Sequence, residues 1–180
     1  DFSEDTYRVL TAVDAALMVI DAANGVEPQT RRLLQVCRAR NTPILTFVNK
    51  MDREVQEPLN LMDEIERELG MTVVPFTWPV GMAKFFGGVL DLRKDQMRVF
   101  RPGEDRVAGD EEIIDGLNNP ALSERFAAAY EQASGEIELV REAAPAFDES
   151  EFLAGRQTPM FFGSAINNFG VQEVLDALVD

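Results

Sequence analysis

The stretch Leu45–Glu54, LTFVNKMDRE, begins as an apolar segment and ends with an amide, an ammonium and a carboxylate, on Asn49, Lys50 and Asp52. Its apolar part belongs to Pro43–Val48, PILTFV, a run without polar alternation that predicts a strand covered on both faces. Polar groups directly after such a strand emerge at its carboxyl end, where open α/β sheets bind ligands. The stretch therefore predicts a strand and a ligand site together.

The segments around this stretch alternate between strand and helix. Ala15–Ile20, AALMVI, is a second unbroken apolar run, and Gln29–Ala39 has the apolar spacing of a helix. A further helix is predicted after Pro58, which suits a first turn, and Gly70 suits its C-terminal stop. This order predicts an α/β fold with a doubly wound sheet.

Composition excludes several classes of protein. The 180 residues are 46% apolar, enough for a substantial core, and no apolar run approaches the roughly 20 residues of a membrane helix. With Cys37 as the single cysteine and no histidine, disulfide scaffolds, zinc sites and histidine-based triads are excluded. A net charge of −15 argues against a nucleic-acid surface. A soluble, cytoplasmic protein without a membrane partner is expected.

The polar triplet suits one base in particular. The carboxylate of Asp52 can accept hydrogen bonds from both donors of the guanine edge, N1–H and the 2-amino group. Adenine lacks this pair and would leave the carboxylate unsatisfied at a cost of about 1–3 kcal/mol. The stem of Lys50 can lie along the base with its ammonium in water. Asn49 can use both ends of its amide, bracing neighbouring loops and approaching the base edge. A solvated turn without a ligand remains the alternative.

A second stretch, Thr158–Val171 or TPMFFGSAINNFGV, reads as a short strand, a small-residue turn and the start of a helix. The hydroxyl of Ser164 and the backbone N–H of Ala165 would lie at this strand's carboxyl end, suited to the carbonyl oxygen of guanine. Alone, Gly163-Ser164-Ala165 is more often a tight turn. Together with the first motif on an adjacent strand, it favours a guanine site.

An inserted subdomain is predicted between the two motifs. Asp52 and Ser164 are 112 residues apart, whereas one helix and one strand need roughly 25 to 30. The inserted residues contain three short strand patterns, VVPFTWP, GGVLDL and QMRVF, with a turn near Lys94 and Asp95 between the last two. A long amphipathic helix over Ala121–Ala143 and a short one over Phe147–Gly155 follow.

Trp78 and the pair Phe85-Phe86 are expected in the core of this insert. The glutamates of the long helix are interpreted as a solvated face, with docking on a partner as the alternative. The predicted division is residues 1–70 as part of one domain, 71–157 as the inserted subdomain, and 158–180 as the return to the first domain.

The residues resemble a known family. NKMD with a downstream GSA resembles the guanine-recognition motifs of GTPases, and DFSEDTYRVLTAVDAALMVIDAANGVEPQT resembles the translational GTPases, among them the class II release factors. The resemblance covers essentially the whole chain. It implies that Asn49, Lys50 and Asp52 hold guanine, that Ser164 and Ala165 close over it, and that the nucleotide is GTP or GDP. It also implies a partial P-loop-GTPase-type sheet with an inserted α+β subdomain.

The resemblance further implies a role for the protein, and it implies which steps of that role this chain would contribute. The role is GTP-driven removal of class I release factors from the ribosome at translation termination. The sequence contains no G-x-x-x-x-G-K-[ST] loop, no Asp-x-Pro-Gly-His segment and no switch threonine, which the family places before Asp1. Base recognition alone is expected here, with hydrolysis and Mg²⁺ ligands outside the chain. An elongation factor G-like or ribosome-protection GTPase and a non-nucleotide interaction module are the alternatives.

The resemblance also implies an open sheet edge. Ser3 is predicted to cap a short helix with Val9, Leu10 and Val13 on one face. Ala15–Ile20 would then lack the phosphate-loop strand that pairs with it in the family. Self-association through this uncovered apolar edge is expected.

Overall fold

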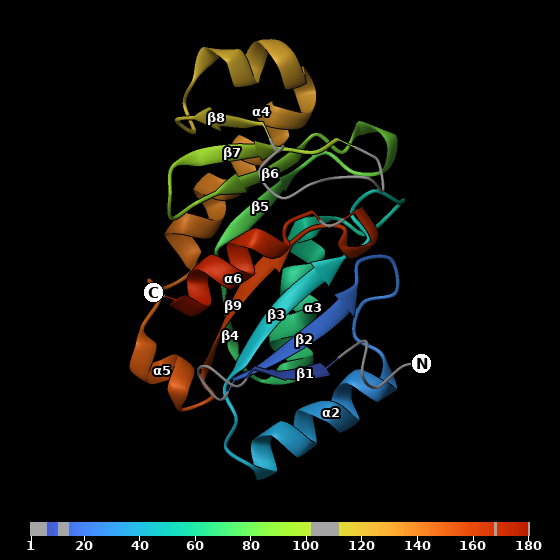
Figure 1. Ribbon diagram of the computed structural model, residues 1–180, viewed down its shortest axis with the longest axis vertical. Coiled ribbons are helices and arrows are strands. Elements are labelled where there is room, and N and C mark those ends of the chain that lie inside the picture. Colours follow the sequence, from blue (N-terminus) through green and yellow to red (C-terminus); the bar gives the residue numbers. More distant parts are fainter. Residues whose placement is uncertain (1–6, 11–14, 102–111, 168, 180) are drawn as a thin grey trace.

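Two sheets make up the computed structural model, which describes residues 7–10, 15–101, 112–167 and 169–179 (Figure 1). The first sheet has the order β1 (Tyr7–Leu10), β2 (Ala15–Asp21), β3 (Ile44–Asn49), β9 (Gln157–Phe162) and β4 (Thr72–Pro75). The second has the order β5 (Thr77–Val80), β6 (Gly88–Asp91), β7 (Gln96–Val99) and β8 (Ile113–Asp115). Pairing among β2, β3, β9 and β4 is parallel, and the second sheet is antiparallel.

The helices agree closely with the sequence pattern. They are α2 (Pro28–Ala39), α3 (Pro58–Leu69), α4 (Pro120–Ala143), α5 (Glu149–Leu153) and α6 (Val171–Val179), with the 3-10 turns η1 (Ala83–Phe85) and η2 (Ala165–Asn167). α3 begins with Pro58 in its first turn, as predicted. Gly70 ends it in the left-handed conformation at φ 66°, where its N–H donates to the Glu66 carbonyl. A left-handed C-terminal residue is where glycine is favoured.

Helices cover both faces of the first sheet, as the doubly wound prediction requires. One face packs against α2 and α3 through a cluster that includes Ile20 and Val48 of the strands and Ile65 of α3. The other face packs against α5 and α6, where Phe47 and Phe161 of the strands lie in one cluster with Phe152 and Val174 of the helices. Because side chains alternate between the faces of a strand, a strand buried on both faces is apolar throughout.

The N-terminal segment differs from the prediction. Val9 and Leu10, expected in a helix, belong to β1, which pairs with β2 in antiparallel register from Tyr7 opposite Met18 to Leu10 opposite Ala15. The expected cap Ser3 and the residue Val13 lie outside the described residues. β1 occupies the edge of β2 that was expected to be uncovered, because unpaired N–H and C=O groups there are satisfied by any extended segment within reach. The predicted self-association through Ala15–Ile20 assumed an uncovered strand edge, and this premise was wrong.

The strand β4 is the second difference. The VVP segment, expected in the insert, pairs with β9 in the first sheet, where Thr72 lies opposite Gln157 and Pro75 opposite Met160. The chain passes into the second sheet only at Thr77. The division at residues 71–157 stays a prediction, and β4 supports a boundary after Pro75.

The insert forms a compact unit on one end of the first sheet. α4 packs against β5, and β6 and β7 form a hairpin whose turn contains Lys94 and Asp95, as predicted. Trp78 and Phe86 are buried, which confirms their assignment to the core. The prediction for Phe85 was wrong, because 71% of this residue is exposed.

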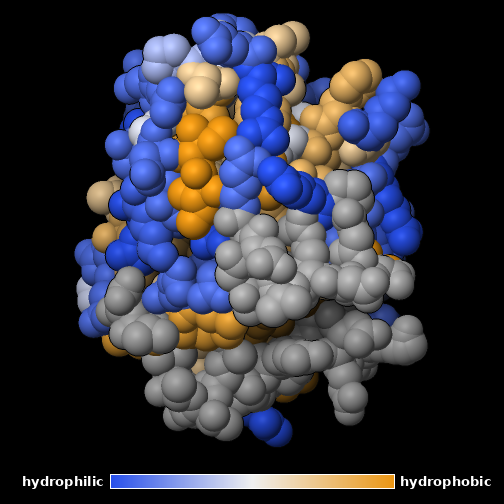
Figure 2. All heavy atoms as spheres, turned by 45° about the horizontal axis from the view of Figure 1, so that its top comes forward, coloured by the Kyte–Doolittle hydropathy of each residue, from blue (hydrophilic) through white to orange (hydrophobic). Residues whose placement is uncertain are grey.

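The outer face of the insert is largely polar. Figure 2 turns the top of Figure 1 toward the viewer, and on this face hydrophilic residues surround a narrow strip of hydrophobic ones. Three glutamates of α4, Glu131, Glu138 and Glu142, are exposed as predicted. Glu136 is partly buried and accepts a hydrogen bond from Trp78 Nε1 at 3.0 Å. In the described part of the chain, no helix is long and apolar enough to cross a bilayer.

Candidate functional site

The two predicted motifs meet where β3 and β9 end. These strands are parallel neighbours, with Val48 opposite Phe162, so the loops that follow them leave the sheet at the same edge. Two backbone hydrogen bonds join the loops directly. The Gly163 N–H donates to the Val48 carbonyl at 3.0 Å, and the Met51 N–H donates to the Gly163 carbonyl at 3.1 Å. Residues more than a hundred positions apart thus form one site.

Asn49 braces this site with its side chain. Its Oδ1 accepts hydrogen bonds from two backbone N–H groups, that of Lys50 at 2.8 Å and that of Ala165 at 2.8 Å. Its backbone carbonyl also accepts from the Ala22 N–H at 3.0 Å. A single residue therefore connects the ends of β2, β3 and β9, as the sequence analysis expected of it.

Asp52 is held by the second motif. The hydroxyl of Ser164, which is fully buried, donates to Asp52 Oδ1 at 2.8 Å. The Asn167 side chain donates from Nδ2 to Asp52 Oδ2 at 3.3 Å and to Ser164 Oγ at 2.9 Å. An ionised carboxylate has about four acceptor positions. Two donors therefore orient Asp52 and leave acceptor capacity for a ligand.

The Lys50 side chain lies differently from the prediction. Its ammonium, expected in water, forms an ion pair with Asp21 Oδ2 at 2.9 Å. Lys50 has a left-handed backbone at φ 72°, an uncommon conformation for a residue other than glycine. Such conformations cost about 1–3 kcal/mol and occur preferentially at ligand sites.

Asp21 is in turn fixed by the start of the next loop. It accepts hydrogen bonds from the backbone N–H groups of Ala23 at 2.8 Å and Asn24 at 3.2 Å. Burial of the carboxyl acts to raise its pKa, but the hydrogen bond from Lys50 and those two N–H groups together hold the pKa of Asp21 below its usual 3.8. The carboxylate is therefore ionised at neutral pH and anchors the Lys50 ammonium.

The loop after β9 is a tight structure of its own. Ser164 and Phe169 pair through two backbone hydrogen bonds, of 3.0 Å from the Ser164 N–H and 2.9 Å from the Phe169 N–H. Gly170 follows in the left-handed conformation at φ 84°, and a Cβ there would lie 2.5 Å from the Phe162 carbonyl oxygen. This closure presents Ser164 and Ala165 to the first motif.

All five sequence-predicted site residues are therefore brought together, and two partners were missed. Asn167 lies in the quoted second stretch, but nothing in its spacing distinguishes it from an ordinary loop asparagine. Asp21 ends the strand beside β3, and the rule that ligands bind at carboxyl ends of strands could have indicated it. Within residues 7–10, 15–101, 112–167 and 169–179, no cluster of three or more histidine, cysteine or acidic side chains has the arrangement of a metal site.

Comparison with known proteins decides the family. The family described as elongation factor Tu GTP binding domain matches residues 1–180, the whole chain. The chain belongs to this GTP-binding domain family. The predictions of family and fold, a part of a P-loop-GTPase-type sheet with an inserted α+β unit, are confirmed by this match and by the two sheets.

Individual proteins that resemble this chain have a more specific name. The chain is 78% identical over 180 residues to peptide chain release factor 3 of Bordetella avium, and 77% identical over 180 residues to that of Bordetella petrii. Over 181 residues it is 75% identical to peptide chain release factor 3 of Nitrosomonas europaea. Each alignment covers 100% of this chain and 34% of the relative, so the chain spans about a third of the length of these curated relatives.

Proposed function

We propose that this chain holds the guanine base of GTP and GDP for a translational GTPase. The observation that carries the proposal is the convergence on Asp52. Its carboxylate lies at the carboxyl end of the sheet and is oriented by Ser164 at 2.8 Å, across 112 residues of sequence. A solvated turn or an interaction module would not need a buried hydroxyl to orient one acidic side chain.

Each residue of the site has a definable part in base recognition. Asp52 accepts from N1–H and the 2-amino group, which together distinguish guanine from adenine. The Ala165 N–H, held by Asn49 at 2.8 Å, lies in the loop that would cover the guanine carbonyl oxygen. The ion pair with Asp21 extends the Lys50 stem in a fixed direction, so that its methylene groups form an apolar surface for the ring.

The names of the relatives favour a role in translation termination over an elongation or ribosome-protection role. We infer that the whole protein works in the cytoplasm on the ribosome, where GTP drives the removal of class I release factors. The phosphates and Mg²⁺ would be held by residues outside the motifs of this chain, and GTP hydrolysis would depend on those residues. This chain contributes the specificity for guanine.

Substitution of Asp52 by asparagine tests the proposal. Asp52→Asn exchanges an acceptor for a donor, which opposes the guanine 2-amino group and suits the 2-oxygen of xanthine. In a protein of the relatives' length that carries this chain, we expect GDP affinity to fall at least about tenfold and XDP affinity to rise. Titrations with fluorescent GDP, XDP and ADP measure both changes.

Asp63→Asn is the matched control, because Asp63 is an exposed carboxylate on α3. It should leave all three affinities unchanged. The proposal is wrong if wild-type protein binds ADP as tightly as GDP, or if Asp52→Asn leaves the preference for GDP over XDP as it was.

A further inference from the structure

A buried ion pair joins the insert to the helix that follows the candidate base loop. Arg98 of β7 donates from Nε to Glu173 Oε2 of α6, and the exposed fractions of the two side chains are 9% and 2%. A second pair on the same helix, Lys94 to Asp176 at 2.5 Å, is more exposed, at 43% and 29%. Exposed pairs contribute little, whereas breaking a buried one is strongly destabilising.

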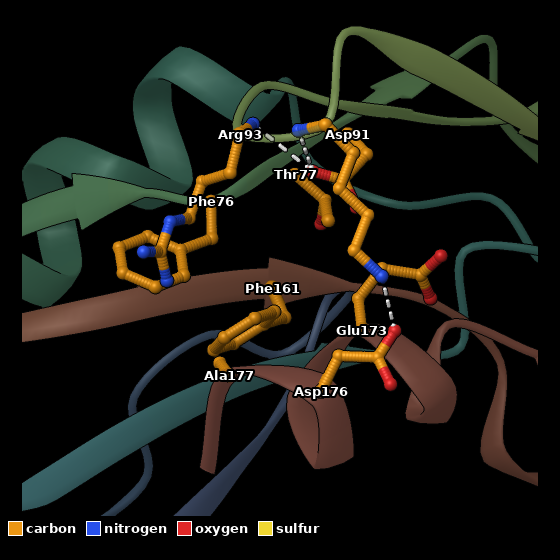
Figure 3. Close-up of a pocket in the computed structure, with 9 residues that line it drawn as sticks. Phe76, Thr77, Asp91, Arg93, Phe161, Glu173, Asp176 and Ala177 are labelled. Atoms are coloured by element: carbon orange, nitrogen blue, oxygen red, sulfur yellow. Dashed lines mark hydrogen bonds and ion pairs between the residues drawn. The ribbon is translucent and has the colours of Figure 1, made fainter. Parts of the chain in front are cut away.

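The surroundings of Glu173 make this pair sensitive to displacement. Figure 3 shows Asp91 of the insert and Glu173 and Asp176 of α6 lining a cavity of about 140 Å³, where the Asp91 carboxylate accepts from the backbone N–H groups of its own turn. Among the described residues, Glu173 Oε1 is a buried side-chain oxygen without a hydrogen-bond partner. Burial raises the pKa of Glu173, against the opposing effect of Arg98. The ion pair with Arg98 of the insert therefore offsets part of the cost of burying this carboxyl group.

The insert also contacts both loops of the candidate site. Phe169, which closes the Ser164 loop, is fully buried and packs against Phe86 and Phe100 with ring centroids 5.8 Å and 5.2 Å away. On the other loop, the Met51 carbonyl accepts a hydrogen bond from the Ala83 N–H of η1 at 3.1 Å. The insert therefore contacts both the loop that carries Asp52 and the loop that carries Ser164.

We propose that Arg98 and Glu173 are positioning residues for guanine binding, and that displacement of the insert from α6 loosens the Ser164 loop and releases the nucleotide. The inference rests on the proposed function and adds a means of regulating it. α6 begins one residue after Gly170, so a shift of Glu173 is transmitted to the loop through a single tight turn. By thermodynamic linkage, bound nucleotide stabilises the docked insert to the same extent.

Three variants separate positioning from general stability. Arg98→Met leaves a buried carboxyl group without its partner, and Glu173→Gln keeps the shape while removing the charge. The double change Arg98→Met with Glu173→Leu replaces the pair by apolar side chains, which is often tolerated. Asp176→Asn is the matched control, because it removes the exposed pair of the same helix.

The primary measurement is the dissociation rate of fluorescent GDP. The protein used contains this chain and is as long as the curated relatives. We expect about tenfold faster dissociation for Arg98→Met, a smaller increase for Glu173→Gln, and recovery toward the wild-type rate in the double variant. Asp176→Asn should dissociate at the wild-type rate. Association rates should change little, since the residues that meet the base are intact.

Hydrogen exchange without nucleotide gives an independent readout. The amides of Ser164 and Ala165 should exchange faster in Arg98→Met than in wild type, and at the wild-type rate in Asp176→Asn. If Arg98→Met lowers the melting temperature but leaves both the GDP dissociation rate and the exchange of these amides unchanged, the pair is only structural and the inference is wrong. Wild-type protein that shows no preference for GDP would instead refute the proposed function, while the exchange data would still decide the coupling.

Discussion

Removal of one hydroxyl group tests how the candidate site is preorganised. Ser164→Ala deletes the donor that lies 2.8 Å from Asp52 Oδ1 and leaves the space of a fully buried small residue almost unchanged. A hydrogen bond to a charged group contributes about 1.5–3 kcal/mol. Because Asp52 is only partly buried and Asn167 still donates to its other oxygen at 3.3 Å, the lower end of that range applies. Because this bond already exists without nucleotide, its loss weakens binding only through the orientation of Asp52, so we expect a loss of up to about 1.5 kcal/mol in GDP binding, or at most roughly tenfold in affinity.

Titration with fluorescent GDP measures this loss, and Ser123→Ala provides its control. Ser123 also donates to a carboxylate, Glu131 at 3.2 Å, but at an exposed position on α4. Its replacement should leave the affinity unchanged. A double-mutant cycle with Asp52→Asn should show non-additivity, because Ser164→Ala removes the donor of this hydrogen bond and Asp52→Asn replaces its charged acceptor by a neutral amide oxygen. If Ser164→Ala binds GDP as tightly as wild type, or if its effect adds fully to that of Asp52→Asn, the assigned role of Ser164 is refuted.

Two further predictions concern the supports of the site. Gly170→Ala should destabilise the protein by about 2–3 kcal/mol, because the added Cβ would meet the Phe162 carbonyl oxygen at 2.5 Å. The control Gly135→Ala on α4 would meet nothing within 4 Å and should be neutral or slightly stabilising. Thermal unfolding compares the two variants, and equal melting temperatures would contradict the predicted strain at Gly170. Asp21 should titrate below 3.8 by carboxyl NMR, and Lys50→Met should raise that pKa, so the stability from this pair is present above pH 3.8 and disappears as the pH falls through the lowered value. An unchanged pKa in Lys50→Met would show that Lys50 does not hold Asp21.

Local signals predicted the parts of the fold that depend on local chemistry. The continuous apolar runs of β2 and β3 follow from burial on both faces of a parallel sheet. The limits of α3 follow from Pro58 and Gly70, which suit the first turn and the left-handed C-terminal position. The five site residues were predicted because each motif directly follows such a strand.

The errors arose where long-range competition decides the structure. Tyr7–Leu10 can be read as helix or strand, and pairing with the edge of β2 settles it as a strand. Thr72–Pro75 has the same apolar character whether it enters the insert or the first sheet, and the available edge of β9 decides. Phe85 and Phe86 are neighbours of identical type, so only the direction of the turn at η1 separates the exposed ring from the buried one.

The supports of the candidate site show why motifs alone describe it incompletely. A motif identifies the groups that would touch the base, but their positions are set by residues without any motif: Asn167 on Asp52, Asp21 on Lys50, and Arg98 on the helix after the loop. Arg98 and Glu173 are 75 residues apart in the sequence, and each alone reads as an ordinary surface charge. Their burial follows from the packing of the insert against α6. An insert placed between the two halves of a candidate site, and packed against both of its loops, is therefore in the position that the proposed coupling requires.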